Sequence, residues 1–420
     1  MAYRLLTGRY VIRYPEAPGR GPEPDGDTLK FRPDDPTLVE DLGRASGVEP
    51  DLSAQHRISL RLEAVDALET HFAGTNQDPV LGFAARDALL AFAGFRDVVF
   101  DPARPSQVRS ANADDLPGWV LSNGVEGNGR LVSFAFTGTP PLADGATIEL
   151  DETMLRASAN ADLLARGLAY PLLYTTLPVT LRDLAVSISR AARADGVGVW
   201  ERSTADPNGA ADVSGGTAAL RELVIWPKLF RRLVSFFAVG QQNIAGFGAW
   251  LRANPAERDD AVMLLDTGQF ARLHDLVTVA GPTIALNRWP DSFVILPAGA
   301  PGPVPIPQPP AAQRVGAVRI VAALVDPFGV DAGSETVTVL NTTGRSITLD
   351  GWTLSDTHND IDLLDGQIIG AGDALRVRLT KVLLGNTGDT IVLRDPTGAV
   401  IDRVGYTAAE APKRAQTLVF

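Results

Sequence analysis

The sequence contains no cysteine, only four histidines and only four lysines, and these shortages exclude several kinds of site. Without cysteine the chain can form no disulfide, no zinc–thiolate site and no catalytic thiol. A multi-histidine zinc site would require the fold to gather histidines that are scattered along the chain, at His56, His71, His274 and His358. A catalytic or metal site would therefore consist chiefly of carboxylate and guanidinium groups.

The chain also lacks a basic charge balance and a long apolar run. Its formal net charge is −12, so any nucleic-acid contact has to come from a local cluster of arginines. The basic residues are nearly all arginine, the better bidentate phosphate ligand, although lineage base composition produces the same bias. No run approaches the length of a membrane span, and residues 1–15 lack the apolar core of a secretory signal. We expect a cytoplasmic protein or the mature form of a secreted one.

The length of 420 residues suits two or three domains, each with its own core. Residues 297–310 are PAGAPGPVPIPQPP, and prolines at this density favour a stiff extended spacer because they can join neither a helix nor a sheet. The sequence before this spacer mixes helix and strand patterns, and the sequence after it alternates strands and turns. We predict a domain over residues 1–203, a helical extension or small helical domain over 204–296, a linker over 297–316 and a domain over 317–411.

The first 203 residues carry patterns that suit a small barrel with helices packed on it. In residues 56–65, Ile58, Leu60 and Leu62 point one way and the intervening polar residues point the other. A helix is expected after Asp78, which can cap it, with Pro79 in its first position. Further strands are expected at residues 10–14, 28–32 and 130–137, and further helices at 151–167 and 181–194.

The region from residue 216 to residue 286 contains helical stripes, but we recognise no chemistry in it. Pro227 lies inside one stripe and predicts a kink or a break there.

Three short polar clusters in the first domain can carry chemistry. DGDT occupies residues 25–28, Arg61 precedes Asp66 and Glu69, and Asn-Gly-Arg occupies residues 128–130. Phosphodiester cleavage needs a hard cation held by carboxylates, a carboxylate that activates water, and guanidinium groups near the developing negative charge. The three clusters supply each of these groups.

Each cluster taken alone also has an ordinary structural explanation. Asp and Gly are common turn residues, and GDT recurs at residues 388–390, where we expect only a turn. An arginine and two acids near a strand end can be a solvated ion pair that contributes little to stability. The order and spacing of the clusters together favour a shared site.

Taken together, the clusters resemble the thermonuclease, or staphylococcal nuclease-like, family. The family pattern of D-G-D-T, R-L-x-x-x-D-x-x-E and a later G-R is matched by DGDT at 25–28, RLEAVDALE at 61–69 and NGRLVSFAF at 128–136. ARGLAY at 165–170 is similar to the family's helix-end segment, and GVGVWERS at 196–203 is similar to its terminal segment. The resemblance covers residues 8–203.

This resemblance implies a five-stranded OB barrel with helices and a role for each matching residue. Asp27 and Asp66 would be the carboxylate ligands of Ca²⁺, and the backbone carbonyl of Ala67 would be a further ligand. Glu69 would act as general base or would position the water. The scissile phosphate of DNA or RNA would contact Arg61 and Arg130.

The sequence departs from the family pattern at several positions. Ala67-Leu68 replaces a common Thr-Pro, which is tolerable where only a carbonyl binds metal. Asn128 stands where a phenol is common, so one hydrogen bond to the substrate is in doubt. Residues 33–55 and 96–119 resemble insertions, and they leave Arg104 and Arg109 as rivals of Arg130.

The region of residues 318–406 resembles a lamin-tail domain, which is an immunoglobulin-like sandwich. The resemblance depends on VTVLNTTGRSITLDGWTLSD at 337–356 and GDTIVLRDPTGAVIDRVGY at 388–406, where NTTG and DPTG are hairpin turn signals. Such a module suggests an adhesion or targeting unit for a partner, a surface or nucleic acid. We interpret one acidic cluster as a solvated loop rather than a cation site: Asp356, His358, Asp360 and Asp362.

The sequence therefore predicts a multidomain α+β protein with an OB barrel, a helical middle region and a C-terminal sandwich. Two functions remain open at this point. One is a calcium-dependent nuclease tethered to a lamin-tail binding module. The other is a non-catalytic scaffold or nucleic-acid-binding protein on the same architecture.

Overall fold

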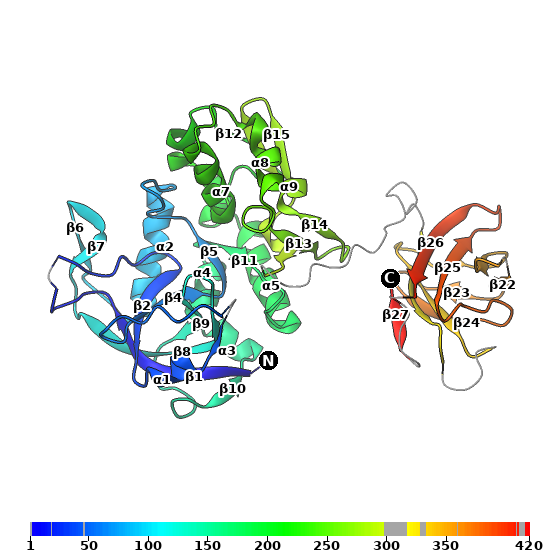
Figure 1. Ribbon diagram of the computed structural model, residues 1–420, viewed down its shortest axis with the longest axis horizontal. Helices are drawn as coiled ribbons and strands as arrows, with labels where there is room; N and C mark the ends of the chain where they lie inside the picture. Colours follow the sequence, from blue (N-terminus) through cyan, green and yellow to red (C-terminus); the bar gives the residue numbers. More distant parts are fainter. Residues whose placement is uncertain are drawn as a thin grey trace. The chain divides into compact units, whose positions relative to one another are not determined.

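The computed structural model divides the chain into two compact units, residues 1–303 and residues 304–420 (Figure 1). It describes residues 2–17, 19–44, 47–297, 317–327, 333–358, 360–408, 410 and 416–420. All of the predicted linker except Pro297 lies outside the described residues. Within the described part, no helix has the length and apolarity needed to cross a membrane.

Five strands of the first unit close into a barrel. Around the barrel each strand pairs with the next, and β8 pairs back to β1. The β4–β9 pair is parallel and the other four pairs are antiparallel. In barrel order the strands are β1 (Ala2–Val11), β2 (Thr28–Pro33), β4 (Ile58–Leu62), β9 (Leu131–Phe136) and β8 (Asp115–Val125), with β10 (Thr147–Glu149) and β3 (Gly43–Arg44) at the edges.

The alternation predicted for residues 56–65 is present in β4 but stops earlier than expected. Ile58, Leu60 and Leu62 are buried in the barrel, which confirms the side they were predicted to share. Ala64 has φ of 67°, a left-handed conformation that breaks the strand. The chain then continues as β5 (Ala64–Ala67), which pairs with β11 (Ala169–Leu172) instead of the barrel.

Strand β8 was missed by the sequence analysis, which assigned part of it to an insertion. Its Pro117 and Gly118 are typical of turns, so the local sequence argued against a strand. In the barrel Gly118 is required because a Cβ there would overlap the Tyr10 ring. The buried Tyr10 hydroxyl lies within hydrogen-bond distance of the carbonyls of Trp119 and Phe136, at 3.0 and 2.7 Å, and thereby ties β1 to β8 and β9.

Helices lie against the outside of this barrel (Figure 1). Asp78 caps α2 by accepting a hydrogen bond from Leu81 N at 2.9 Å, and Pro79 is the first helical residue, as predicted. The helix expected at residues 151–167 is two helices, because Ser158 caps a second one. The elements are α1 (Thr37–Glu40), α2 (Pro79–Phe92), β6 (Val99–Asp101), β7 (Arg104–Ser110), α3 (Glu152–Arg156), α4 (Ala159–Ala165), α5 (Val179–Ala194) and α6 (Val199–Arg202).

The predicted helical middle region was only partly right, because it also contains two small antiparallel sheets. Its strands have two to four residues, too few to show an alternating pattern. Pro227 breaks the helical stripe, as predicted, by starting α7. The elements are β12 (Ala211–Asp212), η2 (Gly216–Glu222), α7 (Pro227–Ala238), η3 (Ile244–Gly246), α8 (Phe247–Ala253), β13 (Ala261–Leu264), β14 (Phe270–Arg272), α9 (Leu273–Leu276), β15 (Val277–Ala280), β16 (Thr283–Leu286), η4 (Pro290–Ser292) and β17 (Phe293–Ile295).

This middle region shares a buried core with the barrel side of the unit. Leu68, Tyr170 and Leu172 belong to the same apolar cluster as Phe230 and Phe236 of α7. In addition, the Ile295 N–H donates to the carbonyl of Leu173 at 2.8 Å. The segment after residue 203 is therefore continuous with the first domain.

The second unit is a sandwich of two four-stranded sheets around its own apolar core. The DPTG segment forms the predicted hairpin between β25 and β26. NTTG does not join paired strands, because β19 pairs with β18 and β24 instead of β20. GDT at 388–390 begins a strand and is not only a turn. The strands are β18 (Val318–Leu324), β19 (Thr336–Asn341), β20 (Ile347–Thr348), β21 (Thr353–Ser355), β22 (Ile361–Leu363), β23 (Ile368–Ile369), β24 (Ala374–Arg378), β25 (Gly388–Arg394), β26 (Val400–Thr407) and β27 (Thr417–Val419).

Candidate active site

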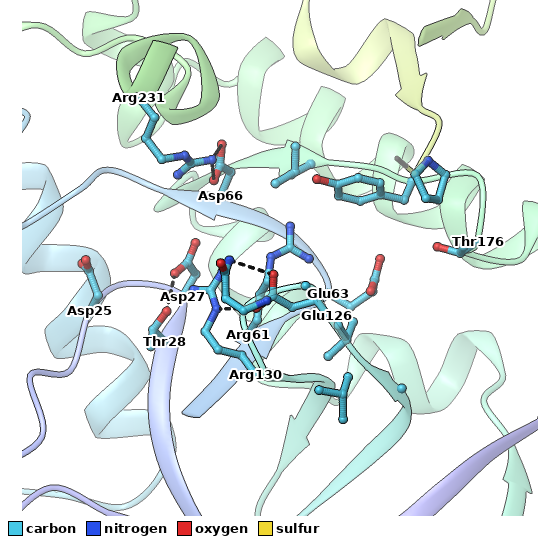
Figure 2. Close-up of a pocket in the computed structure, with 18 of the residues that line it drawn as sticks. Asp25, Asp27, Thr28, Arg61, Glu63, Asp66, Glu126, Arg130, Thr176 and Arg231 are labelled. Carbon is cyan, nitrogen blue, oxygen red and sulfur yellow. Dashed lines mark hydrogen bonds and ion pairs between the residues drawn. The ribbon is translucent and has the colours of Figure 1, made fainter. Parts of the chain in front are cut away.

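A cleft of about 940 Å³ opens on the first unit where β2, β4 and β5 meet the β8–β9 turn and α7 (Figure 2). Most of its polar lining is carboxylate or guanidinium. The charged lining residues are Glu23, Asp25, Asp27, Arg44, Arg61, Glu63, Asp66, Glu69, Glu126, Arg130 and Arg231, with His71 beside them.

Five of the six residues predicted for the site line this one cleft. They are Asp27, Arg61, Asp66, Glu69 and Arg130. Ala67 is not a lining residue; its N–H lies 3.4 Å from Asp27 Oδ2. The barrel thus brings together segments that lie about 100 residues apart in the sequence.

The DGDT segment is held by its own hydrogen bonds and by close packing. Asp25 Oδ1 accepts from Gly26 N at 2.7 Å, and Asp27 Oδ1 accepts from Thr28 Oγ1 at 3.0 Å. A Cβ at Gly26 would lie 2.5 Å from the Cβ of Ala67 and 2.8 Å from that of Ala85. Only glycine therefore lets this turn pack between β5 and α2, which places Asp25 and Asp27 at the cleft.

Arg231 of α7 enters the cleft and pairs with two of the predicted catalytic residues. Its Nη2 donates to Asp66 Oδ1 at 2.9 Å and to Oδ2 at 3.2 Å, and its Nη1 donates to Glu69 Oε1. The backbone N–H of Lys228 also donates to Asp66 Oδ2, at 2.9 Å. The middle region, in which the sequence suggested no chemistry, therefore contributes a guanidinium to the cleft.

Burial raises the pKa of three carboxyl groups near Arg231 and the DGDT turn. It raises the pKa of Asp25 to about 6, and repulsion from Asp27 adds to the shift. It raises the pKa of Glu69 to about 8 although Arg231 acts in the opposite direction. The pKa of Asp66 is also raised by burial, against the pull of Arg231. The cleft thus concentrates carboxyl groups that favour a nearby cation.

Arg61 differs from the other arginines of the cleft in its partners. Within the described residues, no carboxylate oxygen lies within 4.0 Å of its guanidinium, which sits 5.3 Å from the centre of the Tyr174 ring. By contrast, Arg130 Nε donates to Glu126 Oε1 at 3.0 Å. Arg61 therefore has donors available for an anion in the cleft.

The structure distinguishes Arg130 from the two alternatives raised by the sequence. Arg104 and Arg109 belong to β7, and neither lines the cleft. Arg104 pairs instead with Asp101 at 3.4 Å. Asn128 does line the cleft, where its side chain donates to Glu126 at 3.1 Å.

Glu63 is a further acid that the sequence analysis did not assign to the site. It is buried beside Arg61, and among the described residues its Oε1 has no hydrogen-bond partner. Burial raises its pKa, while the charge of Arg61 acts in the opposite direction. The sequence did contain a signal for Glu63, because this residue ends the alternating segment on the same polar side as Arg61.

The side chains of the cleft have the donor atoms of a calcium site but not its arrangement. Its carboxylates are the oxygen donors that calcium prefers. Among the described residues, however, no three His, Asp or Glu side chains of the cleft bring ligand atoms within 4.8 Å of one another. Arg231 pairs with both Asp66 and Glu69. The calcium site implied by the resemblance is not preformed, so we assign no reaction step to the ion.

The acidic cluster of the second unit is only partly the solvated loop we expected, since His358 and Asp360 are exposed. Asp356 and Asp362 are buried, and Asp362 accepts from the N–H groups of residues 380–382. Ligand atoms of Asp356, His358 and Asp389 lie within 4.8 Å of one another. Burial alone would raise the pKa of Asp389. The hydrogen bonds that it accepts, several of them from backbone N–H groups, outweigh burial and lower this pKa.

The comparison with protein families agrees with the fold of the second unit. Residues 311–408 match the family model described as Lamin Tail Domain, which confirms the resemblance predicted for this part. The match leaves the barrel and its cleft outside it. No curated protein matches the chain.

Proposed function

We propose that the first unit is a thermonuclease-like phosphodiesterase that hydrolyses DNA, RNA or both, and that the lamin-tail domain tethers it to a partner or surface. The observation that carries the proposal is the unpaired guanidinium of Arg61 in a cleft shared with Asp27, Asp66 and Glu69. The barrel adds support, because its strand order around the closed sheet is β1-β2-β4-β9-β8 with β4 parallel to β9. An OB barrel likewise consists of five strands.

The chain's own groups suit hydrolysis of a phosphodiester. Arg61 would bind the phosphate oxygens with its fork of donors and stabilise the charge that develops on them. Glu69 would take a proton from the attacking water, once it is deprotonated and released from Arg231. A bond then forms between the water oxygen and phosphorus while the bond to the leaving oxygen breaks. If calcium takes part, Asp27, Asp66 and the Ala67 carbonyl are its proposed ligands, and it would supply additional positive charge.

The direct test is incubation of the purified protein with single-stranded DNA, duplex DNA and RNA, in calcium or in excess chelator. Arg61→Ala should lower the cleavage rate by ~10²–10³-fold, the usual effect of losing one donor to a developing oxyanion. Arg32→Gln is the matched control: Arg32 is also on the barrel but pairs with Asp115 outside the cleft, at 3.0 Å.

The alternative is a non-catalytic scaffold. It predicts that the protein binds a nucleic acid without cutting it under any of these conditions. That result would remove the enzyme proposal, and equal cleavage by Arg61→Ala and the parent would remove Arg61 from it.

A further inference from the structure

Arg231 holds the two carboxylates on which the proposed chemistry depends, although it lies 165 residues after Asp66 in the chain. Asp66 has 2% side-chain exposure and Glu69 has 15%, so both carboxylates have lost most of their water. Arg231 itself is 25% exposed. The guanidinium therefore supplies the positive charge that these buried acids need.

Arg231 is held near the carboxylates because α7 is anchored on both sides. Lys228 N–H donates to Asp66 from the first turn of α7, and Gln77 Nε2 donates to the carbonyl of Ile225 at 2.8 Å just before it. Leu229, Phe230 and Leu233 of this helix are fully buried in the apolar core. Withdrawal of the whole helix would open this core, so the Arg231 side chain is the part that can move.

A divalent cation held by Asp66 next to Glu69 would compete with Arg231 for this negative charge. Both oxygens of Asp66 accept from Arg231 Nη2, and Glu69 Oε1 accepts from Nη1. An ion bound there would also be repelled by the guanidinium at short range in a poorly hydrated site. Both cations cannot occupy these carboxylates together.

We propose that Arg231 is a built-in counter-ion that competes with a divalent cation held by Asp66 beside Glu69 and so sets the cation affinity of the cleft. The biological use of this competition rests on the proposed function. Its test does not, because the test measures cation binding without nucleic acid. Metal loading displaces the guanidinium from the carboxylates. The middle region, through α7, thereby controls how readily the cleft takes up the ion.

The test is calorimetric titration of the full chain with Ca²⁺ alone, without nucleic acid. Arg231→Gln should bind Ca²⁺ at least ~10-fold more tightly than the parent, because the competing charge is gone while Asp66 and Glu69 remain. Arg232→Gln is the matched control from the same helix. Its Nη2 pairs with Asp260 at 3.0 Å instead of a residue of the cleft, so its calcium affinity should equal that of the parent.

A second variant covers the risk that Arg231→Gln does not fold with Asp66 left unpaired. Arg231→Lys keeps one charge but loses the fork of donors, and its Ca²⁺ affinity should exceed that of the parent by several-fold. Equal or weaker affinity in the folded variants, or no binding by any of them, overturns the inference. If the variants bind Ca²⁺ as expected but the parent cuts no nucleic acid with the ion bound, the proposed function fails and the inference stands.

Discussion

Glu69 is the residue whose environment most directly links the structure to the proposed reaction. Its side chain is 15% exposed, desolvation raises its pKa to about 8, and it is paired with Arg231. A solvated ion pair at this position would contribute little to activity. A general base would instead have to be released from Arg231 and deprotonated before it could act.

Replacement of Glu69 by glutamine separates these two roles. Glu69→Gln keeps the shape and removes the charge, so nuclease activity should fall by ~10²–10⁴-fold, as for loss of general-base help. Nucleic-acid binding should persist because Arg61 is unchanged. The measurement is the initial cleavage rate beside a binding titration. A rate within a few-fold of the parent, with the fold intact, would show that Glu69 is not the base.

The same variant has an expected effect on the pH dependence of stability. The pKa of Glu69 rises from its ordinary value of 4.5 to about 8, so between these pH values the folded state holds a proton that the unfolded state has lost. The contribution of this group is therefore fully present below the unfolded pKa and is lost as pH rises towards about 8. Glu69→Gln should reduce the fall in melting temperature of the first unit between pH 5 and 8, as measured by calorimetry. An unchanged pH dependence would contradict the raised pKa.

At the scale of elements, the site depends on the contact between the DGDT turn, β5 and α2. Gly26 is the contact point, with Ala67 on one side and Ala85 on the other. The sequence accounts for Gly26 as an ordinary turn residue. The structure shows that its small size matters more, because its φ is not in the left-handed region.

Gly26→Ala should therefore destabilise the protein by ~1–3 kcal/mol through overpacking. It should also lower activity, since Asp27 follows directly in the chain and would be displaced. Thermal denaturation and the cleavage assay measure the two effects. Gly209→Ala is the control, because a Cβ at Gly209 would meet no atom within 4 Å. Equal stability of both variants would show that the turn can adjust without cost.

At the scale of the whole molecule, the apolar cores indicate which segments of the chain fold together. The core of the second unit contains only residues after residue 317. The core of the middle region instead includes Tyr170, Leu172 and Trp200, all before residue 204. A boundary near residue 203 would cut through one core, whereas the proline-rich segment separates two cores.

We therefore expect a fragment of residues 317–420 to fold alone and a fragment of residues 1–203 to be unstable. The first should melt at the temperature of one of the transitions of the full chain, because it keeps its complete core. The second would expose the apolar residues that Phe230 and Phe236 cover. Calorimetry and circular dichroism of both fragments decide this. A cooperative, stable 1–203 fragment would restore the predicted boundary.

Local patterns in the sequence were sufficient for features that depend on near neighbours. The alternation of Ile58, Leu60 and Leu62, the Asp78 cap and the DPTG hairpin each involve a few consecutive residues, and all three are confirmed. The DGDT and RLEAVDALE segments also meet at one cleft, because Thr28 at the start of β2 pairs with Arg61 near the end of β4.

What the tertiary structure alone decided depends on packing between distant segments. Strand β8 closes the barrel against its local turn signals because Gly118 fits the Tyr10 ring. Arg231 and Arg232 are identical neighbours in the sequence, yet one reaches Asp66 and the other Asp260. Successive residues of a helix point about 100° apart. The sequence determined that α7 carries two arginines, and only the docking of that helix decided which one enters the cleft.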